Sequence, residues 1–184
     1  MLFVGIDPSL TATGLVVLQD DNPEPVLARM CKTDKEARGL KRCGEIERIL
    51  IGAIAEAREL MEGVHNPIRV AIEHYSYASK FNVVGLVELG TTLRWALIRR
   101  GWEFIDPAPT QVKKFAGSKG PQKLKSHVEA LWGYKAKNAD IADAYVLAQI
   151  ARASSTRVPN LTNDQRDVVL KCRTGHSEDR AKAA

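Results

Sequence analysis

Cysteine is scarce in this sequence, and its three residues, Cys31, Cys43 and Cys172, show no CxxC spacing. A disulfide framework and a zinc site are therefore not expected, and a reducing cytoplasm is the expected setting. Long apolar runs are also missing, because no stretch approaches the length of a membrane-spanning helix. The first residues carry no basic segment or cleavage site of a secretory signal. These absences predict a protein that does not associate with membranes.

Internal repeats and low-complexity tracts are absent too. With 45% hydrophobic and 27% charged residues over 184 positions, the composition is that of one globular domain. The net charge of +5 favours an anionic partner only weakly. We expect a domain over residues 1–157 and a polar extension over 158–184. The extension is expected to hold a short helix at 162–172, docked through Val168, Val169 and Leu170, and a frayed end from Thr174.

The opening segment ends on an acid. Residues 2–6 are apolar or glycine throughout, which is typical of a strand buried on both faces, and Asp7 follows directly. A lone carboxylate at the end of a core strand needs hydrogen bonds, a cationic partner or a metal ion. Taken alone, Asp7 is better explained as a residue that caps a turn, and a site requires that other carboxylates meet it.

The remaining pattern predicts a mixed sheet with helices on its faces. Two further strands with short connections should complete an antiparallel meander, and later crossovers should be parallel and right-handed. The helix at 83–100 has one apolar stripe formed by Val84, Val87, Thr91, Trp95 and Ile98. The expected strands are residues 2–6, 11–18, 26–30, 68–72 and 103–106, and the expected helices are residues 40–61, 83–100 and 138–151.

Three more acids occupy related positions. Glu73 directly follows the strand at 68–72, as Asp7 follows the first strand. Asp140 and Asp143 lie three residues apart near the start of the last helix, so both point the same way. Asn138 is a good N-cap, and acids in a first turn suit the helix dipole. That capping role explains Asp140 without a site, but it explains Asp143 less well.

A lysine-rich segment without any acid spans residues 110–128. Lysines on a solvated helix face normally have acidic neighbours, so this segment is more typical of a surface that faces phosphates. Its candidate nucleic-acid contacts are Lys113, Lys114, Lys119, Lys123 and Lys125.

The four carboxylates together predict a metal site. Asp7, Glu73, Asp140 and Asp143 have no accompanying histidine or cysteine, and such an oxygen-rich set suits Mg²⁺ or Mn²⁺. Two ions about 4 Å apart would activate a water and stabilise the leaving oxygen of a phosphodiester. Bound cations would also remove the repulsion among the acids.

The order and spacing of these motifs resemble the RuvC family of Holliday-junction resolvases, within the ribonuclease H-like superfamily. The resemblance covers about residues 1–153. It rests on four motifs: Gly5-Ile6-Asp7-Pro8-Ser9 with Thr13-Gly14, then Ala71-Ile72-Glu73, then Gln111-Val112-Lys113 with Lys123, and Asn138-x-Asp140-x2-Asp143-Ala144.

The resemblance implies an α/β fold with a five-stranded mixed sheet flanked by helices. It implies a homodimer that cleaves two symmetry-related strands of a four-way DNA junction with Mg²⁺, in a bacterial or phage-infected cell. Asp7, Glu73, Asp140 and Asp143 would be the catalytic, metal-binding acids, and Lys113 and Lys123 would contact phosphates. We expect Trp95, on the helix at 83–100, in the dimer interface.

The sequence departs from the family at an aromatic position after the strand-end glutamate. Ser76 aligns there, with Tyr75 and Tyr77 on either side. Either tyrosine, or Phe81, would stack on an unpaired base, or would instead be a core or dimer residue.

Other functions remain open at this point. The same site would suit a nuclease that acts on RNA or on flapped and branched DNA. A junction-binding module without catalysis is a second alternative, although an acidic cluster beside phosphates gives a pure binder no advantage. The opening strand–turn–strand also occurs in actin-like sugar kinases, but those proteins need two such domains.

Overall fold

The structure is a computed structural model that describes residues 1–182 apart from 21, 35, 62–66, 76–81 and 119–123. For residues 174–182 it describes the backbone alone. Within these described ranges, every helix is too short or too polar to cross a lipid bilayer.

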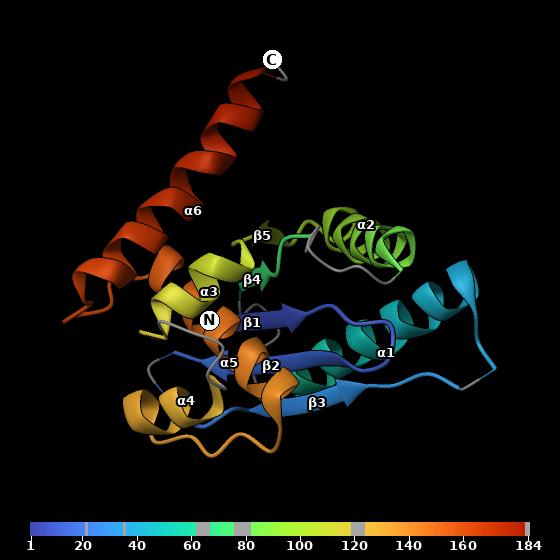
Figure 1. Cartoon of the computed structure of the whole chain (residues 1–184), viewed down its shortest axis with the longest axis horizontal. Helices are drawn as coiled ribbons and strands as arrows, with labels where there is room; N and C mark the ends of the chain where they lie inside the picture. Colours follow the sequence, from blue (N-terminus) through green and yellow to red (C-terminus); the bar gives the residue numbers. More distant parts are fainter. Residues whose placement is uncertain (21, 35, 62–66, 76–81, 119–123, 183–184) are drawn as a thin grey trace.

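The N-terminal third forms the expected antiparallel meander (Figure 1). It consists of β1 (Leu2–Asp7), β2 (Thr13–Gln19) and β3 (Leu27–Cys31). In the β1–β2 ladder Leu2 lies opposite Gln19 and Asp7 lies opposite Gly14. Asp7 is therefore the last residue of its strand, as the sequence predicts.

Two parallel strands complete the sheet. β4 (Ile68–Ile72) pairs with β1, and β5 (Glu103–Ile105) pairs with β4. The strand order is β3-β2-β1-β4-β5, which places β1 in the centre. The helix before β4 is α1 (Gly39–Glu59), and the helix before β5 is α2 (Val83–Arg99). The prediction of a five-stranded mixed sheet flanked by helices is confirmed.

Each face of the sheet has its own core. Leu2, Val4 and Ile6 pack with α1 and α2, whereas Phe3 points to the opposite face, as the two-residue period of a strand requires. That second face is covered by the helices of the C-terminal half: α3 (Pro109–Phe115), α4 (Leu124–Trp132), α5 (Ala139–Ser155) and α6 (Asn163–Lys182).

α5 lies in close contact with β1 and β2. A Cβ atom at Gly5 would overlap the carbonyl oxygen of Ala144, and a Cβ atom at Gly14 would lie 2.5 Å from the carbonyl oxygen of Asp140. The facing side of the helix is built from small residues such as Ala144 and Ala148, both fully buried. Glycines on the strands and alanines on the helix thus let the two backbones approach each other.

Two helices differ in detail from the prediction. On α2 the buried side is formed by Leu89, Leu93 and Leu97, and the apolar stripe with Trp95 faces outward, where Trp95 is 57% exposed. α6 continues to Lys182, whereas we expected a helix ending at residue 172 and a frayed end from Thr174. No proline follows Pro159, and the helix continues through Gly175, which weakens a helix without breaking it as proline would. Val168 and Val169 dock as expected, but Leu170 is 62% exposed.

Candidate active site

A turn closed by side chains holds Asp7 at the end of β1. The Thr13 side chain is fully buried. Its hydroxyl donates to the carbonyl oxygen of Ser9 at 2.8 Å and accepts from the backbone N–H of Ser9 at 3.1 Å. These two bonds join the start of the turn to the start of β2, so the chain after Asp7 has little freedom. Asp7 itself remains partly exposed at the edge of the sheet.

Glu73 lies beside this edge because β4 is parallel to β1. The register pairs Ile6 with Ile72, and the backbone N–H of Glu73 donates to the carbonyl oxygen of Ile6 at 3.0 Å. The carboxyl ends of the two strands therefore bring Asp7 and Glu73 to the same place. The sequence predicts this position.

α5 supplies the other two acids. Its N-cap is Asn138, whose Oδ1 accepts from the backbone N–H of Ile141 at 2.9 Å, as expected. The Asp140 carbonyl group lies against Gly14, the residue opposite Asp7 in the ladder. The first turn of α5 is thereby placed at the sheet edge that carries Asp7 and Glu73.

Burial and repulsion between carboxylates raise the pKa values of Asp7, Glu73 and Asp143. Burial raises the pKa of Asp7 well above its usual value, and the charges of Glu73, Asp143 and Asp140 raise it further. Burial and then the charge of Asp143 raise the pKa of Glu73 to about 7. Burial and then the charge of Asp140 raise the pKa of Asp143 to about 6. The four carboxylates are thus close enough to affect one another, which is the arrangement the sequence predicts.

One cation opposes this repulsion. Lys113, on α3, lowers the pKa of both Glu73 and Asp143, although burial and the neighbouring acids have the larger effect. α3 is only seven residues long, and a helix of this length depends on tertiary contacts. Val112 and Phe115 anchor it in the core, and the Gln111 side chain accepts from the backbone N–H of Ala108 at 2.7 Å.

The acid cluster, formed by Asp7, Glu73, Asp140 and Asp143, has the chemistry of a divalent-cation site. Its donors are all carboxylate oxygens and are partly buried. The raised pKa values of Asp7, Glu73 and Asp143 indicate that added positive charge would stabilise their ionised forms. Within the described ranges, however, no three Asp, Glu, His or Cys side chains are gathered closely enough to enclose an ion. The support for a metal site therefore comes from charge and burial rather than from coordination geometry.

The other predicted lysines are placed differently. The ammonium group of Lys114 lies 2.7 Å from Asp167 and 3.5 Å from Asp164, both on α6, so acids already surround it. Lys125 Nζ donates to the carbonyl oxygen of Lys137 at 3.4 Å. Lys119, Lys123 and Tyr77, together with Phe81, lie outside the described residues.

Tyr75 is anchored on α2. Its hydroxyl lies 3.1 Å from the hydroxyl of Thr91, and the guanidinium group of Arg94 lies 4.4 Å from the centre of its ring. Sequence reasoning missed Arg94 as a residue of this region. The sequence offers no clear signal for it, because α2 is apolar on two sides and the burial of Arg94 beside Gly90 and Leu97 is known only from the fold.

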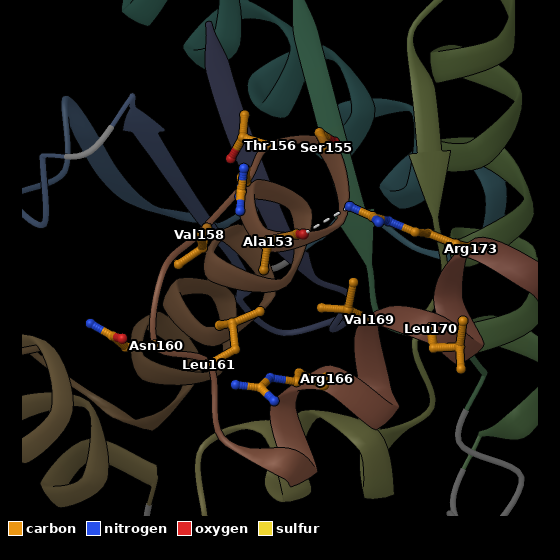
Figure 2. A pocket seen from close by; sticks show the side chains of 11 residues that line it. Ala153, Ser155, Thr156, Val158, Asn160, Leu161, Arg166, Val169, Leu170 and Arg173 are labelled. Atoms are coloured by element: carbon orange, nitrogen blue, oxygen red, sulfur yellow. Dashed lines mark hydrogen bonds between the residues drawn. The ribbon is translucent and has the colours of Figure 1, made fainter.

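A groove lies at the other end of α5 (Figure 2). Its volume is about 710 Å³, and it is lined by the end of α5, the following loop and α6. Arg157, Arg166 and Arg173 line it together with apolar side chains. Arg173 donates to the carbonyl oxygens of Ser154 at 2.8 Å and Ala153 at 3.2 Å, which caps the last turn of α5. A helix of 17 residues spans about 25 Å, so the groove is separate from the acid cluster.

Comparisons with known proteins agree with the motif pattern. No protein-family model matches the chain. The crossover junction endodeoxyribonuclease RuvC of Mycobacterium leprae is 28% identical over 157 residues, which is 80% of this chain and 79% of that protein. The sequence resemblance to RuvC proteins is thereby confirmed.

Solved structures show the same fold. Thermus thermophilus RuvC in complex with a Holliday junction substrate superposes with a TM-score of 0.65 at 20% identity, over 84% of this chain and 97% of the other. A second structure of Thermus thermophilus RuvC gives a TM-score of 0.63 at 19% identity, over 80% and 91% of the two chains. The fold of this chain is therefore that of the RuvC structures.

Proposed function

We propose that this protein is a structure-selective endodeoxyribonuclease that hydrolyses symmetry-related strands of four-way DNA junctions. The observation that carries the proposal is the cluster of Asp7, Glu73, Asp140 and Asp143 at one sheet edge, with Lys113 beside it. The similarity to RuvC of Mycobacterium leprae and to a RuvC structure solved with a Holliday junction substrate supports this choice of substrate.

The four acids would hold Mg²⁺, or Mn²⁺ in its place, as two ions per site. Such ions supply an activated water and neutralise charge at a phosphodiester. Asp7 lies in the centre of the arrangement, since it interacts with all three other acids. The raised pKa values of Glu73 and Asp143 keep a fraction of these groups protonated near neutral pH in the absence of a cation. Ionisation of the cluster is thereby coupled to binding of positive charge.

Lys113 has a separate role. It is exposed on α3, and its charge acts on two of the acids. A phosphodiester bound against the cluster would bring a non-bridging oxygen next to this ammonium group, which would stabilise the charge that develops on phosphorus oxygens. The family resemblance assigns the same role to Lys113.

The test of the function uses Asp7→Asn. This variant should lose cleavage of a labelled four-way junction in Mg²⁺, while binding to the junction stays the same or becomes tighter. Glu56→Gln is a matched control, because Glu56 pairs with Arg29 on the exposed side of α1. Retained cleavage by Asp7→Asn would exclude the mechanism.

A substrate panel tests the specificity. The proposal expects faster cleavage of a four-way junction than of a DNA flap, a linear duplex or a structured RNA. Equal rates on flaps and junctions would indicate a broader nuclease, and preference for RNA would indicate a ribonuclease. Tight junction binding with no cleavage under any metal would indicate a binding module.

We further propose a homodimer that uses the outer face of α2. Val84, Trp95 and Ile98 are each more than half exposed on that face, and two symmetric cuts are most simply made by two symmetric sites. Trp95→Glu should shift the sedimentation of the free protein from dimer to monomer, and Lys41→Glu on α1 is the control. A wild-type monomer that cuts junctions fully would contradict the dimer.

A further inference from the structure

Glu73 has a backbone carbonyl group that the sheet does not satisfy. β4 ends at Ile72, and the last pair of the β1–β4 ladder joins Ile6 to Ile72. A backbone carbonyl beyond the end of a strand needs another donor when it is removed from water. Arg94 supplies it, because Nη2 of Arg94 donates to the carbonyl oxygen of Glu73 at 3.0 Å.

The guanidinium group of Arg94 connects three elements. Nη1 donates to the carbonyl oxygen of Gly90 at 3.1 Å, within α2. Asp106 follows β5, and its Oδ2 lies 3.7 Å from Nε of Arg94. The two groups therefore form an ion pair, but Nε makes no hydrogen bond to Asp106. The Arg94 side chain thus holds α2 against the ends of both β4 and β5.

The site around Arg94 is built for a planar cation. The residue is 9% exposed, and its guanidinium group lies 4.4 Å from the centre of the Tyr75 ring. Gly90 leaves room for both groups, because a Cβ atom there would lie 2.5 Å from Cε1 of Tyr75 and 2.9 Å from Nη1 of Arg94. An ammonium group cannot stack on the ring and donate along two directions in one plane, so lysine would replace only part of these contacts.

We propose that Arg94 is a positioning residue that fixes the main chain of Glu73 and thereby aims the Glu73 carboxylate into the acid cluster. The N–H of Glu73 is held by Ile6, and its carbonyl is held by Arg94. The next residue is held as well, since the backbone N–H of His74 donates to the carbonyl oxygen of Pro107 at 3.0 Å. With both sides of the residue fixed, the backbone sets the direction of the Cα–Cβ bond of Glu73, from which its carboxylate reaches the acid cluster.

Arg94 acts on the site without touching it. Loss of the guanidinium group frees the carbonyl of Glu73 and lets the end of β4 shift. A displacement of about 1 Å in a site of this kind lowers its function by about a hundredfold. The inference rests on the proposed function only in treating Glu73 as a metal ligand. A direct measurement of metal binding therefore tests the role of Arg94 separately from the nuclease activity.

The experiment compares Arg94→Met, Arg94→Lys and Arg99→Met with the wild type. Arg99 lies on the same helix and pairs with Glu47 at 3.2 Å, away from β4, so Arg99→Met removes an arginine of α2 without affecting Glu73. Mn²⁺ binding is measured by the electron paramagnetic resonance of free Mn²⁺, at a temperature where circular dichroism shows each variant folded. The Mg²⁺ concentration for half-maximal junction cleavage is measured in parallel.

We expect Arg94→Met to raise the Mn²⁺ dissociation constant at least about tenfold, equivalent to about 1.4 kcal/mol. Arg94→Lys should recover part of this loss, and Arg99→Met should bind Mn²⁺ as the wild type does. A folded Arg94→Met protein with wild-type Mn²⁺ binding would overturn the inference, and so would a wild type that binds no Mn²⁺. If metal binding falls as expected but the wild type cuts no junction, the role of Arg94 stands and the proposed function is wrong.

Discussion

Lys114 and Asp167 form a close ion pair, with 2.7 Å between Nζ and Oδ2, and this pair joins the C-terminal helix α6 to the short helix α3. Nearby, Nε2 of Gln165 donates to the carbonyl oxygen of Phe115 at 3.2 Å, at the end of α3. Since α3 carries Lys113, the polar extension supports a helix that brings a cation to the acid cluster.

Gln165→Ala should therefore destabilise the protein more than loss of the exposed ion pair does. Gln165 is buried, and its truncation removes the Nε2 donor to the Phe115 carbonyl, a loss that costs about 1–3 kcal/mol for a buried group. Thermal unfolding should show a midpoint lower by several degrees, whereas Lys114→Ala should change it little because exposed ion pairs contribute little. The reverse ranking would mean that charge, rather than the buried amide, joins the helices.

Lys113→Met should slow junction cleavage by about a hundredfold. It should also move the acidic limb of the pH–rate profile to higher pH. Lys113 lowers the pKa of Glu73 and Asp143, so without it both carboxyl groups ionise at higher pH. The measurement is a pH–rate profile at subsaturating Mg²⁺, where the metal-free carboxyl groups still titrate. Lys41→Met is the control, since Lys41 is exposed on α1, which covers the opposite face of the sheet from α3. A slower rate with an unmoved acidic limb would contradict the electrostatic role.

The metal-free protein should lose stability as pH rises from about 5 to about 8. Burial gives folded Glu73 a pKa of about 7, above its usual 4.5, so in this window the folded protein holds protons that the unfolded chain releases. The penalty for ionising Glu73 in the fold is of the order of 3 kcal/mol and is complete above the folded pKa. Asp143 and Asp7 shift in the same direction.

Mg²⁺ should reverse this loss, because it favours the ionised carboxylates. Its addition should raise the unfolding midpoint more at about pH 8 than at about pH 5. Asp7→Asn has one fewer acid and should show both a smaller pH dependence and a smaller Mg²⁺ effect. If the thermal unfolding midpoint instead increased with pH in the presence of a chelator, the proposed pKa shifts of the buried acids would be wrong.

Gly5→Ala should be among the most damaging small substitutions in the chain. The added methyl group would overlap the Ala144 carbonyl oxygen, and neither backbone can yield without separating α5 from β1. We expect a loss of several kcal/mol, seen as insoluble protein or a much lower unfolding midpoint. Gly44→Ala, in the interior of α1 with open space around it, should instead stabilise by about 0.5–1 kcal/mol. If Gly5→Ala and Gly44→Ala had similar unfolding midpoints, the close contact between the backbones of β1 and α5 would be disproved.

Most of the sheet and the four acids can be predicted from local patterns. Runs such as residues 2–6 and 68–72 are continuous, apolar and closed by an acid, so they identify both the strands and the positions of Asp7 and Glu73. Asp140 and Asp143 follow from their spacing of three residues near the start of a helix rich in small, apolar residues. These signals are local and need no tertiary information.

The orientation of α2 and the role of Arg94 could not be predicted in the same way. α2 is apolar on two sides, so the sequence period does not reveal whether Leu93 or Trp95 faces the sheet. Arg94 is bound to residues on β4 and β5, and those contacts exist only after the sheet has formed. Lys114 looked like a phosphate contact because its acidic partners lie about fifty positions later, on α6.

The acid cluster draws on residues 7, 73, 140 and 143, and its first member lies on the central strand of the sheet. A chain emerging from the ribosome has its first strand available long before the start of α5 exists. The cluster therefore cannot assemble until nearly all of the domain has been synthesised. Any chain that stops before α5 contains a sheet edge with two unmatched acids and no complete site.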